Sequence, residues 1–228
     1  MASTAELDRY RQAAPQLYEL LRHKIISLEL LPGAPLSRVQ LSADYRVSQT
    51  PVREALLRLA EEQLIDVFPQ AATKVSLIDT RHAEETHFLR RAIELEIVRD
   101  LALNSTPELL ATLKSLLDRQ VSLQEKQDFG GFAETDQEFH RCMYSAAGKE
   151  ALWKLVRSRS GHIDRLRRLH LPAAGKITRI VSDHSQILAA IVRGDPLAAQ
   201  QHLRTHLSGT LESMEQIRAS HPQFFTQA

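Results

Sequence analysis

Asp136 and His140 are the first residues of this chain whose types and spacing could do chemistry together. Because they are four positions apart, they lie on one face of a helix with about 6 Å between their Cβ atoms. His184 and His206 belong to two later segments with helical periodicity. One carboxylate and three imidazoles that converge inside a bundle form a ligand set for zinc, nickel, manganese or iron. The alternative for each histidine alone is a surface or hydrogen-bonded role, because the chain has ten histidines.

A second stretch of the chain could also make specific contacts, because it has the composition of the first turn of a DNA-recognition helix: Ser48, Gln49, Thr50, Pro51, Val52 and Arg53. Ser48 or Thr50 can cap such a helix, and Pro51 fits a first turn whose N–H groups lack intrahelical partners. In the major groove of double-stranded DNA, Gln49 and Arg53 are suited to base edges, and Thr50 can bond phosphate. The alternative is that Arg53 is a solvated helix residue, and composition alone does not decide.

The elements that must position the first group are helices. After residue 80, apolar residues recur at helical spacing, and Thr106–Pro107 and Asp195–Pro196 have the form of helix starts. The pattern predicts six helices, over residues 80–104, 107–127, 131–147, 149–170, 175–193 and 196–219. We therefore expect an all-α six-helix bundle at 79–220, followed by a C-terminal tail at 221–228.

The elements that position the second stretch follow another pattern. A helix over 15–29 leads through a Pro-Gly turn to short helices at 38–45 and 50–63. The β-branched runs 64–68 and 73–76 then predict a hairpin. This is the element order of a winged helix-turn-helix, predicted for residues 15–78 after a flexible tail at 1–14. The fold class is therefore mainly α, with an N-terminal DNA-binding domain and a C-terminal helical domain.

Composition excludes several classes of protein. The 228 residues are 43% hydrophobic and 25% charged, with a formal net charge of +1. No apolar run reaches the roughly 20 residues of a membrane span, and the polar N-terminus has no secretory apolar region. The single cysteine, Cys142, cannot form an internal disulfide and fits a reducing cytoplasm. The chain has no HExxH motif, nucleophile elbow or phosphate-binding glycine loop, so we expect no enzyme.

The first part of the chain resembles the DNA-binding domain of GntR-type transcription regulators. The resemblance is carried by LPGAPL at 31–36, LSADYRV at 41–47 and SQTPVREAL at 48–56. It implies that Arg53 and the turn at 48–51 contact DNA, and that Arg38 lies close to a basic position of the family's second helix.

The chain departs from the GntR pattern in two places. Gln49 stands where relatives usually carry Arg or Lys, which implies a preference shifted from guanine toward adenine. The wing lacks the family's usual glycine and arginine. We expect Gln70 or Lys74 to compensate in part, and the wing to contribute less to specificity than is usual.

The helical part resembles the FCD effector domain of FadR-type GntR regulators, and best suits the VanR-like subgroup. The resemblance is carried by RRAIE at 90–94, by the spacing of Asp136 and His140, by DHSQILAAI at 183–191 and by His206. Many members hold a metal at the corresponding aspartate and histidines, which implies the same four ligands here, with zinc the first choice.

The resemblance also suggests effector contacts. Arg90 matches the family's cavity-facing arginine; the alternative is a surface i,i+4 pair with Glu94. His162 and Arg165 are further candidates in the fourth predicted bundle helix. We expect a repressor that acts as a homodimer on a palindromic operator and is released by a small carboxylate or sugar acid. The alternatives are a constitutive DNA-binding protein with a structural metal and a metalloenzyme.

Overall fold

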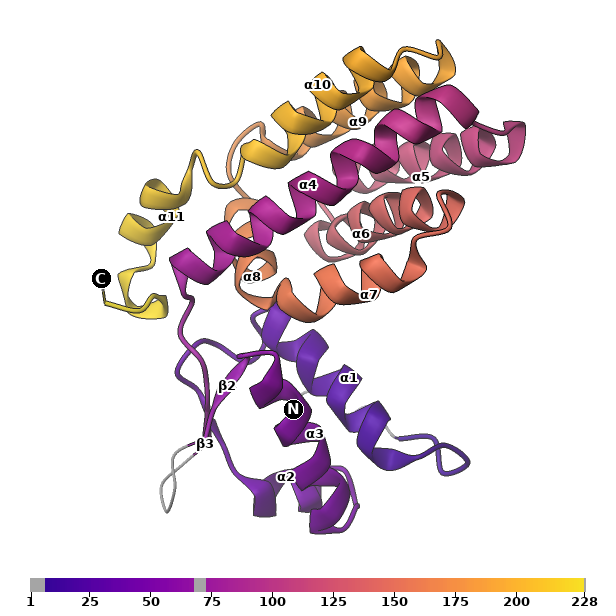
Figure 1. Cartoon of the computed structure of the whole chain (residues 1–228). Helices are drawn as coiled ribbons and strands as arrows, with labels where there is room; N and C mark the ends of the chain where they lie inside the picture. Colours follow the sequence, from indigo (N-terminus) through magenta and orange to yellow (C-terminus); the bar gives the residue numbers. More distant parts are fainter. Residues whose placement is uncertain (1–6, 68–72, 228) are drawn as a thin grey trace. The chain divides into compact units, whose positions relative to one another are not determined.

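The computed structural model describes residues 7–67 and 73–227 (Figure 1). The chain divides into two compact units, one formed by Met1–Thr80 with His221–Ala228 and the other by Arg81–Ser220. Each unit has its own hydrophobic core, and we describe each by itself. Within the described residues, no helix is both long and apolar enough to cross a membrane.

The N-terminal unit contains three helices and a small antiparallel sheet. The helices are α1 (Ala13–Ile26), α2 (Arg38–Asp44) and α3 (Gln49–Glu61). The strands β1 (Pro35–Leu36), β2 (Ile65–Asp66) and β3 (Thr73–Val75) are arranged in the order β1-β3-β2. These elements confirm the predicted winged helix-turn-helix. The sequence pattern missed β1, a two-residue strand that pairs with β3 after the turn at 31–34.

The core of this unit lies between α1 and α3. The buried residues of both helices recur at helical spacing; they are Leu17, Leu21 and Ile25 in α1, and Val52, Leu56 and Leu59 in α3. Arg46, in the turn between α2 and α3, has a positive φ of 51°, a conformation that a tight turn demands of this residue. This packing fixes α3 with one face in the core and the opposite face toward solvent.

An ion pair joins α1 to the end of α3. The Arg22 Nε donates to the Glu62 Oε2 at 2.8 Å, and Arg22 is buried. The Tyr18 hydroxyl also donates to Glu62. Burial and this carboxylate raise the pKa of Tyr18 to about 12. Glu62 therefore accepts from two side chains of α1 at once.

The C-terminal segment, expected as a tail, is part of the N-terminal unit. Residues Pro222–Phe224 form a 3-10 turn, and Phe225 is buried. Ile78 and Phe225 form a parallel bridge: the Ile78 N–H donates to Phe224 O at 2.7 Å, and the Thr226 N–H donates to Ile78 O at 3.1 Å. Two backbone hydrogen bonds and a buried aromatic ring hold this segment against residue 78, just before α4.

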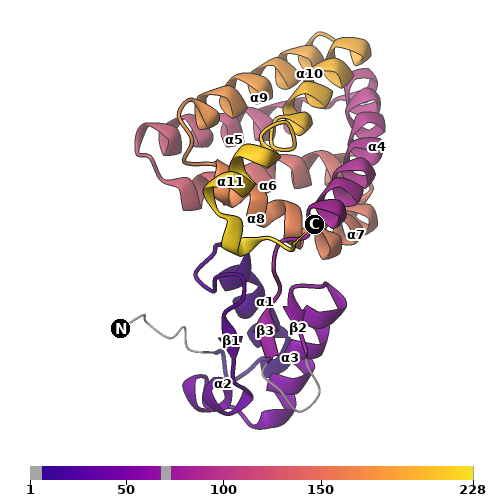
Figure 2. The same cartoon turned by 90° about the vertical axis from the view of Figure 1, so that its left-hand side faces the viewer.

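The second unit is helical throughout, and its helices are those of the predicted bundle with two breaks (Figures 1 and 2). They are α4 (Thr80–Asn104), α5 (Pro107–Glu125), α6 (Phe129–Ala146), α7 (Glu150–Arg159), α8 (Gly161–His170), α9 (Lys176–Val192), α10 (Pro196–Ser208) and α11 (Met214–Ser220). Thr106 and Asp195 cap α5 and α10 as predicted, each accepting from a backbone N–H three residues on.

The two breaks correct the predicted helices 149–170 and 196–219. The first break is at Ser160, whose hydroxyl lies 3.0 Å from Arg157 O and 2.5 Å from the Asp164 carboxylate. The second follows Ser208, where the run Ser208–Gly209–Thr210 has weak helix propensity. Apolar periodicity continues across both breaks, which is why the pattern missed them.

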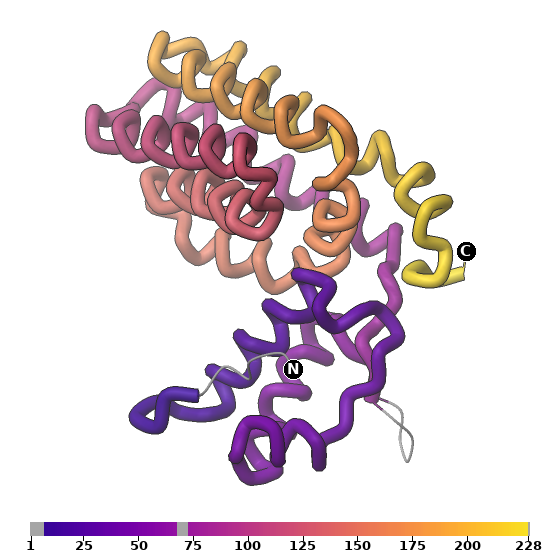
Figure 3. Tube along the Cα trace, turned by 180° about the vertical axis from the view of Figure 1, so that it is seen from behind, coloured from indigo at the N-terminus to yellow at the C-terminus, as the bar shows by residue number. Residues whose placement is uncertain are grey.

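The core of the helical unit lies among α5, α6, α9 and α10. α9 packs on α10, and α5 packs on both α6 and α9 (Figure 3). The buried apolar residues of this core include Leu113, Phe139, Ile187, Ile191 and Leu203. Phe139 directly precedes the predicted metal ligand His140, and Ile187 follows His184 by three residues, so these core contacts fix the parts of α6 and α9 that carry the ligands.

Replacing Glu62 by Ala is expected to lower the free energy of unfolding of the N-terminal unit by about 3 kcal/mol, because the buried Arg22 guanidinium loses the Glu62 carboxylate. Hydrogen exchange of the α1 and α3 amides in the full chain measures this change. The control is Glu61→Ala, which alters the neighbouring, exposed carboxylate. Equal exchange in the two variants would contradict the prediction.

Candidate metal centre and nucleic-acid interface

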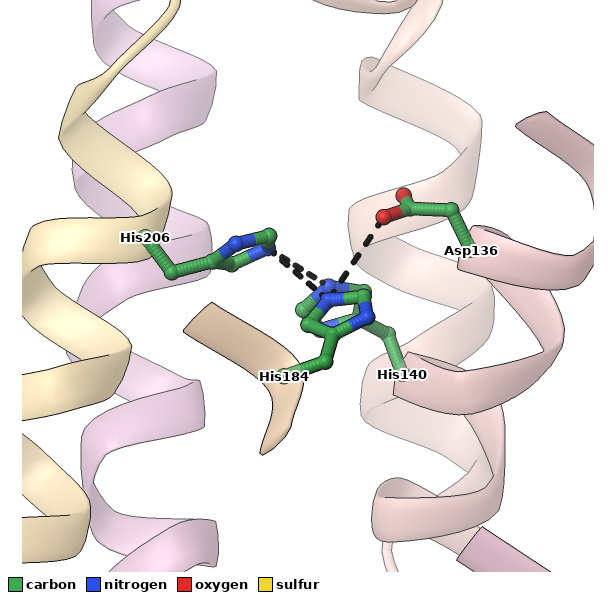
Figure 4. A group of neighbouring side chains, drawn as sticks. All are labelled: Asp136, His140, His184 and His206. Atoms are coloured by element: carbon green, nitrogen blue, oxygen red, sulfur yellow. Dashed lines mark hydrogen bonds and ion pairs between the residues drawn. The ribbon is translucent and has the colours of Figure 1, made fainter. Parts of the chain in front are cut away.

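The four predicted metal ligands converge in the helical unit (Figure 4). Asp136 and His140 come from α6, His184 from α9 and His206 from α10, and one ligand atom from each lies within 4.8 Å of all the others. His206 Nε2 lies 3.1 Å from His140 Nε2 and 3.2 Å from His184 Nε2. The Asp136 Oδ1 lies 3.6 Å from His184 Nε2. The i,i+4 pair and the two distant histidines therefore form one group.

The other ring nitrogen of each histidine faces an acceptor. His140 Nδ1 lies 2.9 Å from Glu94 Oε2, and His184 Nδ1 lies 2.8 Å from Gln120 Oε1. The Asp183 Oδ2 lies 3.7 Å from His206 Nδ1. A carboxylate or amide oxygen beside Nδ1 favours the tautomer that carries its proton there. This arrangement leaves an Nε2 lone pair on each histidine, directed to the centre of the group.

The donor set fits a divalent metal ion. Three lone pairs and a carboxylate oxygen at these separations repel one another unless a cation lies between them. Around a tetrahedral ion with bonds of about 2.05 Å, neighbouring ligand atoms lie about 3.3 Å apart. The distances of 3.1, 3.2 and 3.6 Å bracket this value. The group is therefore spaced as a metal-binding site.

Burial keeps the ligands in the protonation states that bind metal. Burial lowers the pKa of His140 to about 4 and holds the pKa of His184 well below its ordinary value. Burial alone would raise the pKa of Asp136, but His140, His184 and Arg167 outweigh it and keep that pKa well below normal. Near neutral pH, His140 and His184 are therefore neutral and Asp136 is ionised, which are the forms that coordinate metal.

The predicted DNA-contacting residues of the recognition helix lie on its exposed face. Val52, Leu56 and Leu59 are buried, whereas Gln49, Thr50 and Arg53 are exposed. Pro51, the third residue of α3, is half-buried. The N-terminal end of α3, with its unpaired N–H groups, thus has Gln49, Thr50 and Arg53 pointing away from the core.

The remaining predicted contacts lie at the edges of the same unit. Ser48 occupies the N-cap position of α3, but its hydroxyl makes no capping bond and is exposed, so it is free to donate to a phosphate oxygen. Arg38 is the exposed first residue of α2. Lys74 is exposed in the middle of β3, opposite Pro35 and Asp66. The prediction for Gln70 lies outside the described residues.

Comparison with protein families matches both units. The bacterial regulatory proteins of the gntR family match residues 13–75, and the FCD domain matches residues 85–209. This chain is a DNA-binding transcription regulator of the GntR family. The first match covers the helix-turn-helix and sheet, and the second covers all four residues of the metal-ligand group.

Individual relatives cover nearly the whole regulator. It is 36% identical over 209 residues to an HTH-type transcriptional regulator in an unstable DNA locus of Streptomyces ambofaciens, covering 92% of this chain and 88% of that one. It is 28% identical over 227 residues to the HTH-type transcriptional repressor RspR of Escherichia coli, covering all of both chains. The solved structure of E. coli McbR/YncC is similar with a TM-score of 0.79 and 25% identity, over 90% of this chain and 98% of that one.

The buried pair of Arg90 and Glu94 lies directly behind the metal-ligand group. Arg90 Nε donates to Glu94 Oε1 at 2.5 Å, and Tyr144 donates to the same oxygen at 3.4 Å. Arg90 forms the i,i+4 pair with Glu94, but the pair is buried and not on the surface. A contact of Arg90 with an effector stays a prediction. Burial alone would raise the pKa of Glu94, but Arg90 and His140 hold it well below normal. The pair thus keeps a charged acceptor on His140.

Of the other two predicted effector residues, neither contributes to the metal-ligand group. Arg165 Nη2 lies 3.0 Å from His162 Nδ1, and Arg165 Nε donates to Gly161 O at 3.2 Å. The His162 ring lies 4.7 Å from the ring of His82. The α8 residue that acts on the group is Arg167, whose charge lowers the pKa of Asp136.

Sequence reasoning missed the partners of the ligands. Gln120 is fully buried and Asp183 mostly so, yet in sequence both stand as ordinary polar residues of predicted helices. The sequence pattern indicates Glu94 only as a partner of Arg90 and gives no sign of its contact with His140. A signal existed, because a polar residue at a core position of an apolar helix needs a buried partner, and Gln120 follows the core positions Leu113 and Leu117 at helical spacing.

Replacing Glu94 by Gln is expected to weaken zinc binding by about 10- to 100-fold, because His140 loses the charged acceptor that holds its tautomer and orientation. Competition with a zinc-binding dye measures the affinity. The control is Glu96→Gln, an exposed carboxylate on the same helix that pairs with Arg99. Unchanged zinc affinity in Glu94→Gln, with Glu96→Gln also unchanged, would show that Glu94 does not support the site.

Proposed function

We propose that this regulator senses a small carboxylate or sugar acid at a metal ion held by Asp136, His140, His184 and His206. The Nε2 atoms of the three histidines converge, and the Nδ1 atom of each ring faces an acceptor oxygen. This convergence is the observation that carries the proposal. Zinc is our first choice for the metal, and nickel, manganese and iron bind the same donor set.

A bound metal would supply Lewis acidity and open coordination positions. The four protein ligands leave one or two positions on an ion that takes five or six partners, and an oxygen of the acid fills them. The side chains of His140 and His184 are fully buried, whereas those of Asp136 and Asp183 are 15% and 14% exposed. The acid therefore approaches from the side of the two aspartates.

We further propose that residues 15–78 read a palindromic operator as half of a homodimer, in the cytoplasm, and that residues 79–220 carry the effector site. One winged unit reads only a few base pairs, so a two-fold pair of units is needed for useful specificity. The name of the relative RspR supports a repressor role. A coupling of about 1–3 kcal/mol between the effector and DNA sites changes occupancy 5- to 150-fold.

One alternative remains open beside this proposal: a constitutive DNA-binding protein whose metal is structural. It differs in one measurable respect, because a structural metal stabilises the helical unit while no acid adds to that effect. The metalloenzyme alternative is set aside because the family and the matched relatives are transcription regulators.

Arg53→Ala is expected to weaken operator binding by about 10- to 100-fold, because the exposed guanidinium at the start of α3 contacts a base edge. Fluorescence anisotropy measures the affinity, with DNA that the unsubstituted protein selects from a random library. The control is Arg119→Ala, which removes an exposed arginine of the helical unit. Metal content should be unchanged in both variants. Full operator binding by Arg53→Ala would overturn the recognition-helix assignment.

Small carboxylates and sugar acids are expected to raise the melting temperature of the zinc-loaded protein by about 5 °C at a hundredfold excess over Kd. The rise should vanish with chelator and in His184→Ala, which loses a metal ligand. Thermal shift and metal content are measured together, with His202→Ala, on the same helix as His206, as the control. Stabilisation by zinc without response to any acid would favour the structural metal, and an unchanged metal content in His184→Ala would refute the ligand set.

A further inference from the structure

Lys176 carries a half-buried positive charge near the metal-ligand group without a partner. It is the first residue of α9, and its ammonium makes no hydrogen bond or ion pair with any residue of the described chain. A buried or half-buried ammonium is costly unless it is paired. A charge in this condition points to a counter-ion that comes from outside the chain.

The position of Lys176 is fixed relative to the metal ligands by two neighbours. A Cβ added to Gly209 would lie 3.2 Å from the Lys176 Nζ, and Gly209 follows His206 by three residues. Lys176 and Asp183 are seven residues apart on α9 and share one face of the helix, and Asp183 faces His206. Lys176 therefore lies on the side of the group where the aspartates are partly exposed.

Arg167 adds a second positive charge at the same place. It is a residue of α8, and its charge lowers the pKa of Lys176 and that of Asp136. The carboxylate nearest to Arg167 belongs to Asp164 at 3.9 Å, and Asp164 is already bound by Arg157 at 3.2 Å and Ser160 at 2.5 Å. Asp164 therefore neutralises Arg167 only weakly.

The carboxylates near Lys176 do not bind it: Asp183 and Asp136 act to raise its pKa, but neither forms an ion pair with its ammonium. Burial, then Arg167 and Arg179, lowers the pKa of Lys176 to about 8. The buried Nδ1 of His170, whose pKa is lowered by burial and by Lys176, has no hydrogen-bond partner among the described residues. Ile177 and Leu171, adjacent to Lys176 and His170, pack on Phe132, one turn before Asp136. This apolar contact joins the cation pair to the helix that carries two metal ligands.

We infer that the effector is a small acid with two anionic groups, one bound by the metal and the other by Lys176 and Arg167. The inference rests on the proposed function and goes beyond it by naming the charge and the second binding point of the effector. A single carboxylate on the metal would leave Lys176 without a partner and Arg167 only weakly neutralised by Asp164, whereas a second anionic group forms charge-assisted hydrogen bonds with both cations.

Isothermal titration calorimetry on the zinc-loaded full chain tests the inference with small acids that carry one or two anionic groups. Butanoate and succinate differ only in the second carboxylate, and 3-phosphoglycerate offers phosphate as the second anion. Succinate or 3-phosphoglycerate is expected to bind at least about tenfold more tightly than butanoate. Lys176→Met should reduce this preference to within about twofold while retaining butanoate binding and zinc content, because it removes one charge-assisted bond. The control Lys114→Met removes an exposed lysine that pairs with Asp118 and should keep the preference.

The outcomes separate this inference from the proposed function. Preference for succinate assigns a second carboxylate, and preference for 3-phosphoglycerate assigns a phosphate. Equal binding of butanoate and both dianions, or a preference that Lys176→Met leaves intact, would overturn the two-anion inference alone. If no acid binds the zinc-loaded protein, the acid-sensing function fails together with the inference.

Discussion

The helical unit is organised around a repulsion that it cannot relieve with its own side chains. The three histidines and the ionised Asp136 face one point, and one ligand atom of each lies within 4.8 Å of all the others. Protonation would relieve the repulsion in water, but burial disfavours the charged imidazole. Glu94 and Gln120 lie 2.9 and 2.8 Å from the Nδ1 atoms of His140 and His184 and favour a proton there. A divalent cation bound at this point would relieve the repulsion and link α6, α9 and α10.

The buried ion pair behind the metal-ligand group extends this linkage to a fourth helix. Glu94 contacts both His140 and Arg90, so the position of α4 depends on the position of a metal ligand. α4 begins at Thr80, the residue at which the N-terminal unit ends in the chain. The bridge between Ile78 and Phe225 fixes the backbone just before that point. The chain therefore runs directly from the DNA-binding unit into the helix that carries Glu94.

The two units use charge in opposite ways. In the N-terminal unit, Arg53 and the polar residues Gln49 and Thr50 of α3 are exposed. These side chains stay hydrated until they contact a phosphate or a base edge. In the helical unit several charges near the metal-ligand group are buried or half-buried, and each of these is costly unless a neighbour or a ligand neutralises it. Arg90 has such a neighbour in Glu94, and Lys176 has none among the described residues. The helical unit is therefore suited to binding a small anion and the N-terminal unit to binding a polyanion.

Local sequence features and the family resemblance were sufficient to predict the fold class, the helix starts at Thr106 and Asp195, and the four residues that converge in the metal-ligand group. These features depend on local spacing and capping, or on residue types rare enough to be recognised one by one. Packing was needed to reveal the breaks at Ser160 and Ser208, the strand β1, the burial of Arg90, and the contacts of Glu94 and Gln120 with the histidines. Each of these depends on a contact between residues distant in sequence, or on a helix break that apolar periodicity passes over. An i,i+4 pair has the same spacing on a surface as in a core, and only packing determines which side of the helix meets water.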